Sequence, residues 1–324
     1  SSSQRHGTVL SAPTTKYPNN PCVAIIALGG YAPDEAAFAN GITYLETQGC
    51  KVKNFYVPSE KFFRFGGTDE ARVKQLYAAI DDAEVDIVLM LRGGYGMSRL
   101  LPLLDFHRIA ASGKKFVGHS DFTAFNLGLF TKTGAPSFAG PMFSYDFCGD
   151  VSDLTWKHFQ EAMTQSSIEI EVVGPQVMSS SIGITADDKA VLWGGNLTML
   201  TSLLGTEFFP SKDQVKGGIL FIEDVNEHPY RIERMLHQLM DAGYLAQQKA
   251  VLMGDVSSYR LSDVDRGYDL NAAIDSIRQR LGKQTPILTG LAFGHCPDKL
   301  TLPLGRYASL SASSEAFILK ANCA

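Results

Sequence analysis

The sequence predicts an α/β protein with two domains, and three observations support this prediction. Short apolar runs alternate with helical segments, which is typical of parallel sheets covered by helices. The chain has 324 residues, enough for two buried cores. After residue 141 the alternation loosens up to about residue 185. We therefore expect an N-terminal domain at 21–150, a crossover linker at 151–185 and a C-terminal domain at 186–324.

The N-terminal part contains strand-like runs separated by helices with clear starts. In the segment 86–91, the residues after Asp86 are continuously apolar, as expected of a parallel strand buried on both faces. Asp34 and Asp69 are good helix starts, and Gly49 is a good helix stop. The expected strands are 23–28, 52–57, 86–91 and 116–117, and the expected helices are 34–48, 69–83 and one ending near 132.

The rest of the chain continues the alternation after one helix and one strand in the linker. Glycine-bounded apolar runs such as 218–222 predict further buried strands. The expected helices are 153–164, 197–204, 230–242 and 270–281, and the expected strands are 168–172, 218–222, 250–254, 286–289 and short strands within 299–320. In 191–197, a Gly-Gly-Asn turn is expected to line a pocket or to cap the helix 197–204.

Composition excludes several classes of function. The formal net charge is −5 with no basic cluster, which disfavours a nucleic-acid partner. The apolar runs are too short to cross a bilayer. Five scattered cysteines contain no Cys-x-x-Cys pair, so neither a zinc site nor a dense disulfide framework is expected. We interpret residues 1–20 as a polar leader left after removal of an export signal, or as an artificial extension.

Residues 115–123 end an apolar strand in a small-residue turn that carries Ser120. Such strand-to-helix turns can expose a serine hydroxyl and bring the next backbone N–H near a developing oxyanion. Phe122 stands where the Gly-x-Ser-x-Gly pattern has its last glycine. A serine before Asp121 and Thr123 can equally be a helix N-cap, so this stretch alone leaves both interpretations open.

A serine nucleophile needs a base, usually a histidine held by a carboxylate. His295 follows a strand in the loop 293–295 and is the best placed of the seven histidines, with His228 second. Glu223 directly follows the run 218–222, so it leaves a buried strand at its carboxyl end, where function collects in parallel sheets.

Other acids and a structural role compete with this assignment. Asp224 and Glu227 are rival acids on the same segment. Glu223 could instead form an ion pair with Arg231 or Arg234.

A glycine-rich loop, Arg92-Gly93-Gly94-Tyr95-Gly96, follows the strand 86–91. Its glycines permit close backbone approach to a substrate oxygen, although a plain tight turn is the alternative. The loop lacks both the dinucleotide and the phosphate-loop patterns, which disfavours nucleotide binding.

Taken together, these segments resemble the LD-carboxypeptidases of serine peptidase family S66. The resemblance covers nearly the whole chain after the leader. It rests on blocks in one order: Phe65-Gly66-Gly67-Thr68, Leu91 to Gly96, Gly118 to Thr123, Leu192-Trp193-Gly194-Gly195-Asn196-Leu197, Glu223 to Pro229, and Phe293-Gly294-His295. It implies an N-terminal open parallel sheet of the flavodoxin or amidotransferase kind and a C-terminal mixed α/β domain with a β-barrel-like sheet. The active site is expected between them.

The resemblance also implies residue roles. Ser120 is the expected nucleophile, His295 the general base and Glu223 the orienting acid. The backbone N–H groups of Asp121 and of a loop glycine, which we take to be Gly94, are the expected oxyanion hole.

A carboxypeptidase must also bind a free carboxylate, for which a guanidinium is well suited. Arg92, Arg99 and Arg231 are the candidates, each with a surface or structural ion pair as the alternative. Trp193 and Asn196 are further substrate-binding candidates, with a core tryptophan and a helix cap as the alternatives.

The expected function is therefore a serine LD-carboxypeptidase without cofactor or metal that removes the terminal D-alanine from murein tetrapeptides in peptidoglycan turnover or recycling. One alternative is a self-immunity hydrolase of peptide-nucleotide antibiotic conjugates, although the sequence shows no clear aromatic platform for an adenylate. The other is a non-catalytic muropeptide-binding protein. We expect a muropeptide partner, a homodimer, Cys296 as a bystander, and a periplasmic location with the cytoplasm as alternative.

Overall fold

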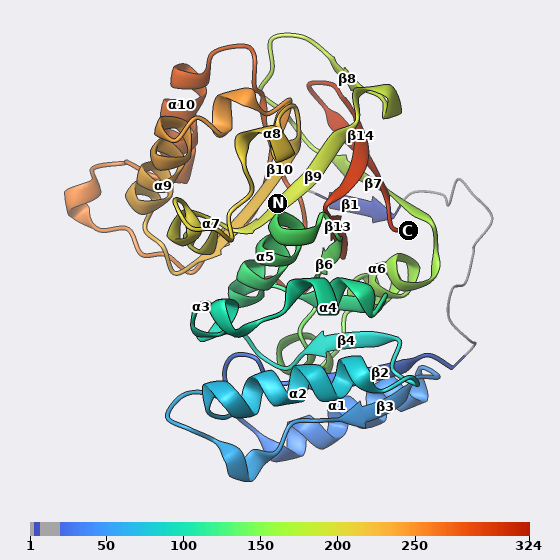
Figure 1. Cartoon of the computed structure of the whole chain (residues 1–324). Coiled ribbons are helices and arrows are strands. Elements are labelled where there is room, and N and C mark those ends of the chain that lie inside the picture. Colours follow the sequence, from blue (N-terminus) through green and yellow to red (C-terminus); the bar gives the residue numbers. More distant parts are fainter. Residues whose placement is uncertain (1–2, 7–19) are drawn as a thin grey trace.

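The computed structural model describes residues 3–6 and 20–324, which form two β-sheets with helices around them (Figure 1). Apart from β1 (Ser3–His6) and β13 (Leu302–Leu304), the elements of the N-terminal half, blue to green, occupy the lower and middle parts of Figure 1, and the yellow to red elements occupy the upper part. The α/β fold class predicted from the sequence is confirmed.

The lower sheet has six strands in the order β13-β6-β5-β4-β2-β3. All neighbours are parallel except β13, which pairs antiparallel with β6. Every residue of β2 and β4 is buried, which explains their continuous apolar sequences. The bounds are β2 Cys22–Ile26, β3 Lys51–Asn54, β4 Ile87–Met90, β5 Lys115–Gly118, β6 Ser137–Ala139 and β13 Leu302–Leu304.

The upper sheet has nine strands and mixed pairing. Its main path runs β1-β7-β15-β14-β9-β10-β11-β12, with β8 paired to β14, and in the described part of the chain this path does not close into a barrel. The bounds are β1 Ser3–His6, β7 Ser167–Val173, β8 Ile182–Ile184, β9 Ala190–Asn196, β10 Ile219–Val225, β11 Ala250–Ser257, β12 Ile287–Thr289, β14 Arg306–Ala312 and β15 Ala316–Asn322.

The helices begin where the sequence places capping residues. Asp34 caps α1, and Thr68 rather than Asp69 caps α2. Helix α5 lies between the two halves of the molecule and packs on both α7 and β9. The bounds are α1 Glu35–Thr47, α2 Asp69–Asp81, α3 Met97–Leu100, α4 Phe106–Ala111, α5 Thr123–Thr133, α6 Asp153–Thr164, α7 Leu197–Leu203, α8 Lys212–Val215, α9 Pro229–Asp241 and α10 Leu270–Leu281.

Two segments differ from their sequence interpretation. The expected crossover contains β7, which lies inside the upper sheet between β1 and β15. Within the expected polar leader, residues 3–6 form β1, which pairs antiparallel with β7. Of the other leader residues, 1–2 and 7–19 lie outside the described residues.

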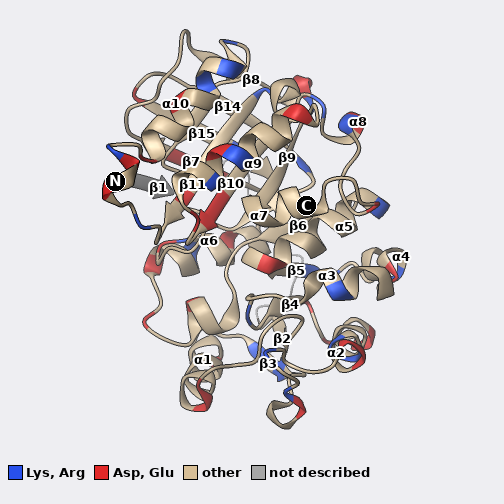
Figure 2. Cartoon of the chain, turned by 90° about the vertical axis from the view of Figure 1, so that its left-hand side faces the viewer, with Lys and Arg blue, Asp and Glu red and all other residues tan. Residues whose placement is uncertain are grey.

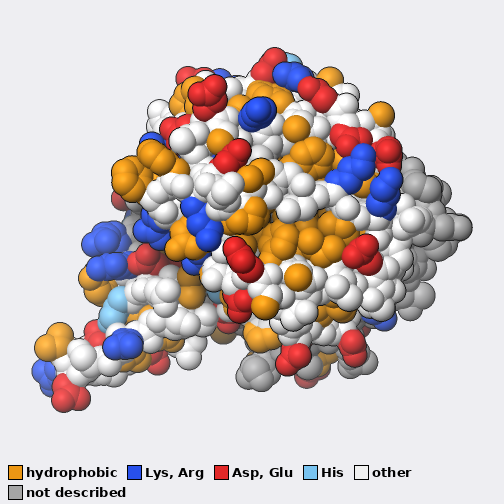
Figure 3. Space-filling model, turned by 90° about the horizontal axis from the view of Figure 1, so that it is seen from below, with side chains coloured by type: hydrophobic (Ala, Val, Ile, Leu, Met, Phe, Trp, Pro, Cys, Tyr) orange, Lys and Arg blue, Asp and Glu red, His pale blue; other side chains and the backbone are white. Residues whose placement is uncertain are grey.

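One loop stands out from the body of the molecule. Residues 258–269, between β11 and α10, project at the left of Figure 1, and the same projection is visible from below in Figure 3. Val264 in this loop is 88% exposed.

Candidate active site

Ser120 occupies a strained turn directly after β5. Its φ angle is 61°, in the left-handed region that non-glycine residues rarely adopt. Such a conformation costs about 1–3 kcal/mol and persists where the surroundings impose it, often at functional sites. Ser120 is the first residue of the 3-10 turn Ser120–Phe122, whose N-cap is His119, and the N-cap of α5 is Phe122, so the N-cap interpretation of Ser120 does not hold.

Glu223 and His295 are hydrogen-bonded to each other at the carboxyl ends of the parallel strands of the upper sheet. Glu223 Oε2 lies 2.9 Å from His295 Nδ1, and the glutamate side chain is fully buried. The pairing of β10 with β11 shifts register between Ile222 and Asp224, which frees Glu223 from that ladder. A carboxylate at Nδ1 favours the tautomer with a proton on Nδ1 and a lone pair on Nε2, as a general base requires.

The pair is brought to the serine turn from the other sheet. The ring of His295 lies 5.2 Å from the ring of His119, the residue before Ser120. The backbone N–H of Asn196 donates to Thr123 Oγ1 at 3.0 Å, which joins β9 to the start of α5. The structure therefore places the Glu223–His295 pair next to the residue that precedes Ser120, while the catalytic roles of the three residues stay a prediction.

The rival acids have other partners. Asp224 accepts hydrogen bonds from the backbone N–H of Thr198 at 2.9 Å and from its hydroxyl at 2.7 Å, and thus holds the start of α7. Burial raises the pKa of Asp224 to about 6. Glu227 lies 3.5 Å from Arg231.

The rival base also has a different role. The Nδ1 atom of His228 accepts the Tyr230 N–H as the N-cap of α9, and its Nε2 atom lies 2.9 Å from Asp265. His228 is thus a helix cap tied to the projecting loop.

The glycine loop after β4 lies against the serine. A Cβ at Gly93 would stand 3.2 Å from Ser120 Oγ, so only glycine fits there without displacement. Gly94 has a φ angle of 86° and open space around its Cβ position. This openness suits a backbone N–H that faces a substrate, although the oxyanion role of Gly94 and Asp121 stays a prediction.

The Asp121 side chain connects this loop to the serine turn. Its Oδ2 accepts the Met97 N–H at 2.9 Å, while burial raises its pKa to about 6. Asp121 thus contributes its side chain to the scaffold, in addition to the N–H that the prediction uses.

The candidate arginines differ in their partners. Arg99 is paired with Asp69 at 3.2 Å, and Arg231 with Glu227. Arg92 donates to the Tyr31 carbonyl at 3.3 Å and, among the described residues, forms no ion pair with an acid. Of the three candidates, Arg92 is thus the one with only a carbonyl partner, and its role in binding a carboxylate stays a prediction.

Two substrate-binding candidates are corrected by the structure. Trp193 is fully buried, and its Nε1 donates to Gln248 at 2.9 Å, so it belongs to the core. Asn196 caps α7 through its Oδ1, and its Nδ2 donates to Glu223 at 3.1 Å, so it supports the acid.

Sequence reasoning missed three residues beside His295. Tyr145 is 49% exposed, and its ring lies 6.1 Å from the His295 ring. It stands in a single π-helical turn, 143–147, of a kind frequent at functional sites. Lys299 and Asp146 form a buried ion pair nearby. Only the position of Lys299 shortly after His295 could have drawn attention to them.

The remaining features give no sign of other chemistry at this point. Burial raises the pKa of the Cys296 thiol to about 12, which makes it a poor nucleophile. Asp and Glu gather at the ends of β10 and β11 in the middle of the molecule (Figure 2), yet no metal-binding cluster occurs within residues 3–6 and 20–324. In the same residues, no helix is both long and apolar enough to span a membrane.

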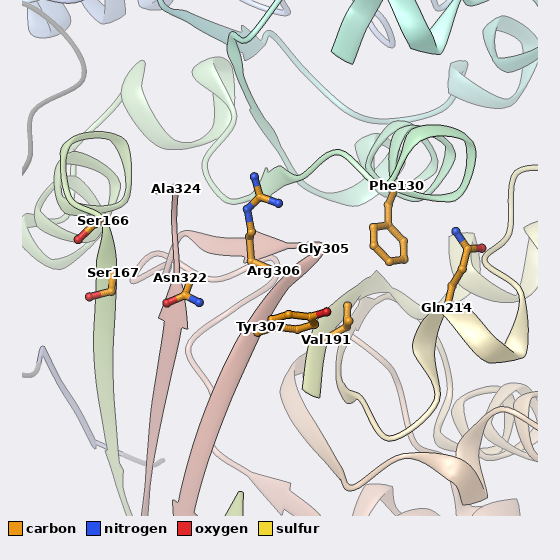
Figure 4. Close-up of a pocket in the computed structure, with 11 residues that line it drawn as sticks. Phe130, Ser166, Ser167, Val191, Gln214, Gly305, Arg306, Tyr307, Asn322 and Ala324 are labelled. Atoms are coloured by element: carbon orange, nitrogen blue, oxygen red, sulfur yellow. The ribbon is translucent and has the colours of Figure 1, made fainter. Parts of the chain in front are cut away.

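A separate cavity of about 770 Å³ lies away from this centre (Figure 4). Residues from α5, β9 and β14 line it, including Phe130, Val191 and Arg306. None of the lining residues belongs to the predicted site.

A serine in a left-handed strand-to-helix turn, close to a histidine that is held by a buried carboxylate, is typical of hydrolases with a Ser-His-acid centre. Comparison with known proteins agrees. The sequence model of the LD-carboxypeptidase N-terminal domain matches residues 23–140, and that of the C-terminal domain matches residues 189–310. The chain belongs to the LD-carboxypeptidase family, and it is accordingly a peptidase.

Individual relatives span most of the chain. A Bacillus subtilis protein described as a probable murein peptide carboxypeptidase is 30% identical and covers 89% of this chain and 88% of its own. The crystal structure of a muramoyltetrapeptide carboxypeptidase from Oxalobacter formigenes has 42% identity, a TM-score of 0.84, and coverage of 93% and 98%. The microcin C7 self-immunity protein MccF of Escherichia coli is 27% identical over 83% of both chains.

Proposed function

We propose that this protein is a serine LD-carboxypeptidase that removes the terminal D-alanine from murein tetrapeptides during peptidoglycan turnover or recycling. The single observation that carries the proposal is the left-handed Ser120 turn beside the Glu223–His295 pair. The names of the relatives from Bacillus subtilis and Oxalobacter formigenes support the murein substrate.

In the proposed reaction, Ser120 Oγ attacks the carbonyl of the L-configured centre of the diamino acid. His295 Nε2 takes the hydroxyl proton, and the N–H groups of Gly94 and Asp121 bind the oxyanion. Collapse of the tetrahedral intermediate breaks the C–N bond, and His295 returns the proton to the leaving D-alanine amine. Water activated by the same histidine then hydrolyses the acyl-enzyme.

The test is mass spectrometry of defined tri-, tetra- and pentapeptide muropeptides after incubation with the protein. Loss of one D-alanine from the tetrapeptide alone is expected, and the Ser120→Ala variant should abolish it. Undiminished release by that variant would refute the serine mechanism.

A second candidate is hydrolysis of a peptide-nucleotide antibiotic conjugate. The exposed ring of Tyr145 beside His295 favours it, because an aromatic face can stack on a nucleobase, and MccF is a relative. Turnover of tetrapeptide and conjugate by the same preparation decides between the two. The hydrogen bond between His295 and the buried Glu223 carboxylate argues against a non-catalytic binding protein, since binding alone does not need an oriented imidazole.

Assembly and compartment are further parts of the proposal. A homodimer is supported by exposed apolar side chains, including Val264, on the projecting loop 258–269, and light scattering of the purified protein tests it. The periplasm is the proposed compartment, and activity confined to the cytosol of fractionated cells would place the enzyme there instead.

A further inference from the structure

Lys299 is a fully buried lysine at the junction of the two halves of the site. Its Nζ lies 3.0 and 3.1 Å from the two carboxylate oxygens of Asp146 and 3.1 Å from His119 Nε2. An ammonium group in a protein interior is costly unless each N–H has a partner, and here three acceptors surround it. The surroundings of Lys299 therefore provide the acceptors that a buried ammonium group requires.

His119 is arranged to accept from Lys299. Its Nδ1 lies 2.9 Å from the Gly140 carbonyl, which can only accept, so Nδ1 carries the proton and Nε2 a lone pair. Burial and the neighbouring Lys299 hold the pKa of His119 well below its ordinary range, which keeps the ring neutral. Lys299, which lies in the segment after His295, thus donates a hydrogen bond to His119, the residue directly before Ser120.

The short segment between His295 and Lys299 is held along its length. The backbone N–H of Lys299 donates to Thr155 Oγ1 at 2.9 Å, and that hydroxyl donates to the Pro297 carbonyl, also at 2.9 Å. Beyond it, the Leu300 N–H bonds to the Ala292 carbonyl at 2.8 Å. The His295 ring, at the start of this segment, stands edge to face on the His119 ring.

The main effect of Lys299 on His295 is to fix the position of its segment and not to change the charge around its ring. Both oxygens of Asp146 contact the ammonium, so the two charges largely cancel at the distance of His295. The Tyr145 ring, 4.3 Å from Lys299 Nζ, covers the ion pair on its solvent side. What Lys299 fixes is the position of one catalytic segment relative to the other.

We propose that Lys299, held by Asp146, is a positioning residue that joins the His295 loop to the Ser120 turn and so aligns base with nucleophile. This inference rests on the proposed serine mechanism, because it assigns Lys299 no contact with the substrate. It predicts that loss of the lysine lowers kcat while KM changes little.

The experiment compares Lys299→Met with Lys115→Met in the full chain. Lys115 is a matched control, because it is also a buried lysine whose Nζ contacts backbone carbonyls, those of Ala162 and Met163, but it lies at the start of β5. We measure thermal unfolding, steady-state kinetics on the tetrapeptide, and the rate at which a fluorophosphonate labels Ser120. Lys299→Met should lose about 10- to 100-fold in kcat and in labelling rate, as expected for displacement of a catalytic group by about 1 Å.

Asp146→Asn and the double variant Lys299→Met/Asp146→Asn separate positioning from stability. The double variant buries no unpaired charge, so its thermal stability should recover relative to Lys299→Met, while its kcat stays low. A folded Lys299→Met protein with wild-type kcat overturns the inference, and so does a recovery of kcat in parallel with stability. If Lys299→Met does not fold, the double variant decides by the same criteria.

Failure of the proposed function would look different. In that case the wild-type protein would neither release D-alanine nor react with the fluorophosphonate at Ser120. If wild-type Ser120 is labelled but the tetrapeptide is not cleaved, only the substrate is wrong, and the labelling rates still test the role of Lys299.

Discussion

Gly294 stands against Glu223 so closely that a Cβ at position 294 would lie 2.9 Å from the glutamate Cβ. The φ angle of Gly294 is 131°, in a region that side chains other than hydrogen disfavour. Only a glycine at position 294 lets the backbone before His295 pack this closely on Glu223. The hydrogen bond between His295 and Glu223 depends on this close packing.

Gly294→Ala is expected to displace either His295 or Glu223 and to lower kcat by about 10-fold or more. Gly282→Ala is the control, because Gly282 also has a positive φ, 71°, but has no atom within 4 Å of its Cβ position. It should cost about 1–3 kcal/mol of stability through backbone strain and leave kcat unchanged. Equal kcat values for the two variants would contradict the steric argument.

Glu223→Gln should reduce kcat by about 10²- to 10⁴-fold, because an amide no longer selects the productive tautomer of His295 or stabilises its protonated form. Steady-state kinetics at neutral pH measures the effect. Asp224→Asn, on the next position of β10, is the comparison and should cost less than about 10-fold, since Asp224 holds α7 rather than the histidine. A larger loss for Asp224→Asn would reassign the acid.

Asp121→Asn should stabilise the protein above pH 6. The pKa of the native carboxyl is raised from 3.8 to about 6, so between these values the native state holds a proton that the unfolded state has released. The free energy of unfolding therefore falls as pH rises from about 4 to about 6 and stays lower above that. Asparagine can still accept the Met97 N–H but cannot ionise.

Urea unfolding of both proteins at pH 4 and pH 8 tests this effect. From pH 4 to pH 8, the free energy of unfolding of the variant should rise by on the order of 2 kcal/mol relative to that of wild type. Asp224 is present in both proteins, so its own titration cancels in the difference. A gain that does not depend on pH would show that Asp121 is already ionised in the native protein without cost.

Arg92→Met should raise KM for the tetrapeptide by about 10- to 100-fold, the value of a charge-assisted hydrogen bond to the terminal carboxylate. A tetrapeptide with an amidated C-terminus lacks that charge and should bind both proteins alike. Arg99→Met is the control, because Arg99 already pairs with Asp69. If Arg99→Met shows the larger KM effect, Arg99 rather than Arg92 holds the carboxylate.

Local signals predicted much of this molecule. The strand ends that present Glu223 and His295 follow apolar runs, and helix 153–164 was predicted with the bounds observed. The prediction that Trp193 binds substrate was less well founded. The Trp-Gly-Gly-Asn run suggests a pocket, whereas every residue of β9 except Val191 is buried. That both faces of a central strand are buried cannot be inferred from a glycine motif.

Other features depend on contacts between distant parts of the chain. Lys299 and Asp146 are 153 positions apart, and neither has a neighbour in sequence that indicates the other. The left-handed angle of Ser120 is likewise imposed by its surroundings and not by its own residue type. Such features follow from tertiary packing and could not be predicted from periodicity or capping.

The two sheets also exchange strands. The amino-terminal strand β1 belongs to the upper sheet, although the next five strands in sequence build the lower one, and β13 returns from the C-terminal half to complete the lower sheet beside β6. Each half of the chain therefore contributes an edge strand to the sheet of the other half. If the chain were cut between its N-terminal and C-terminal halves, each sheet would lack one edge strand. Because neither half contains all of its own sheet, we expect the protein to unfold in one cooperative step and the catalytic centre to be assembled only when the whole chain has folded.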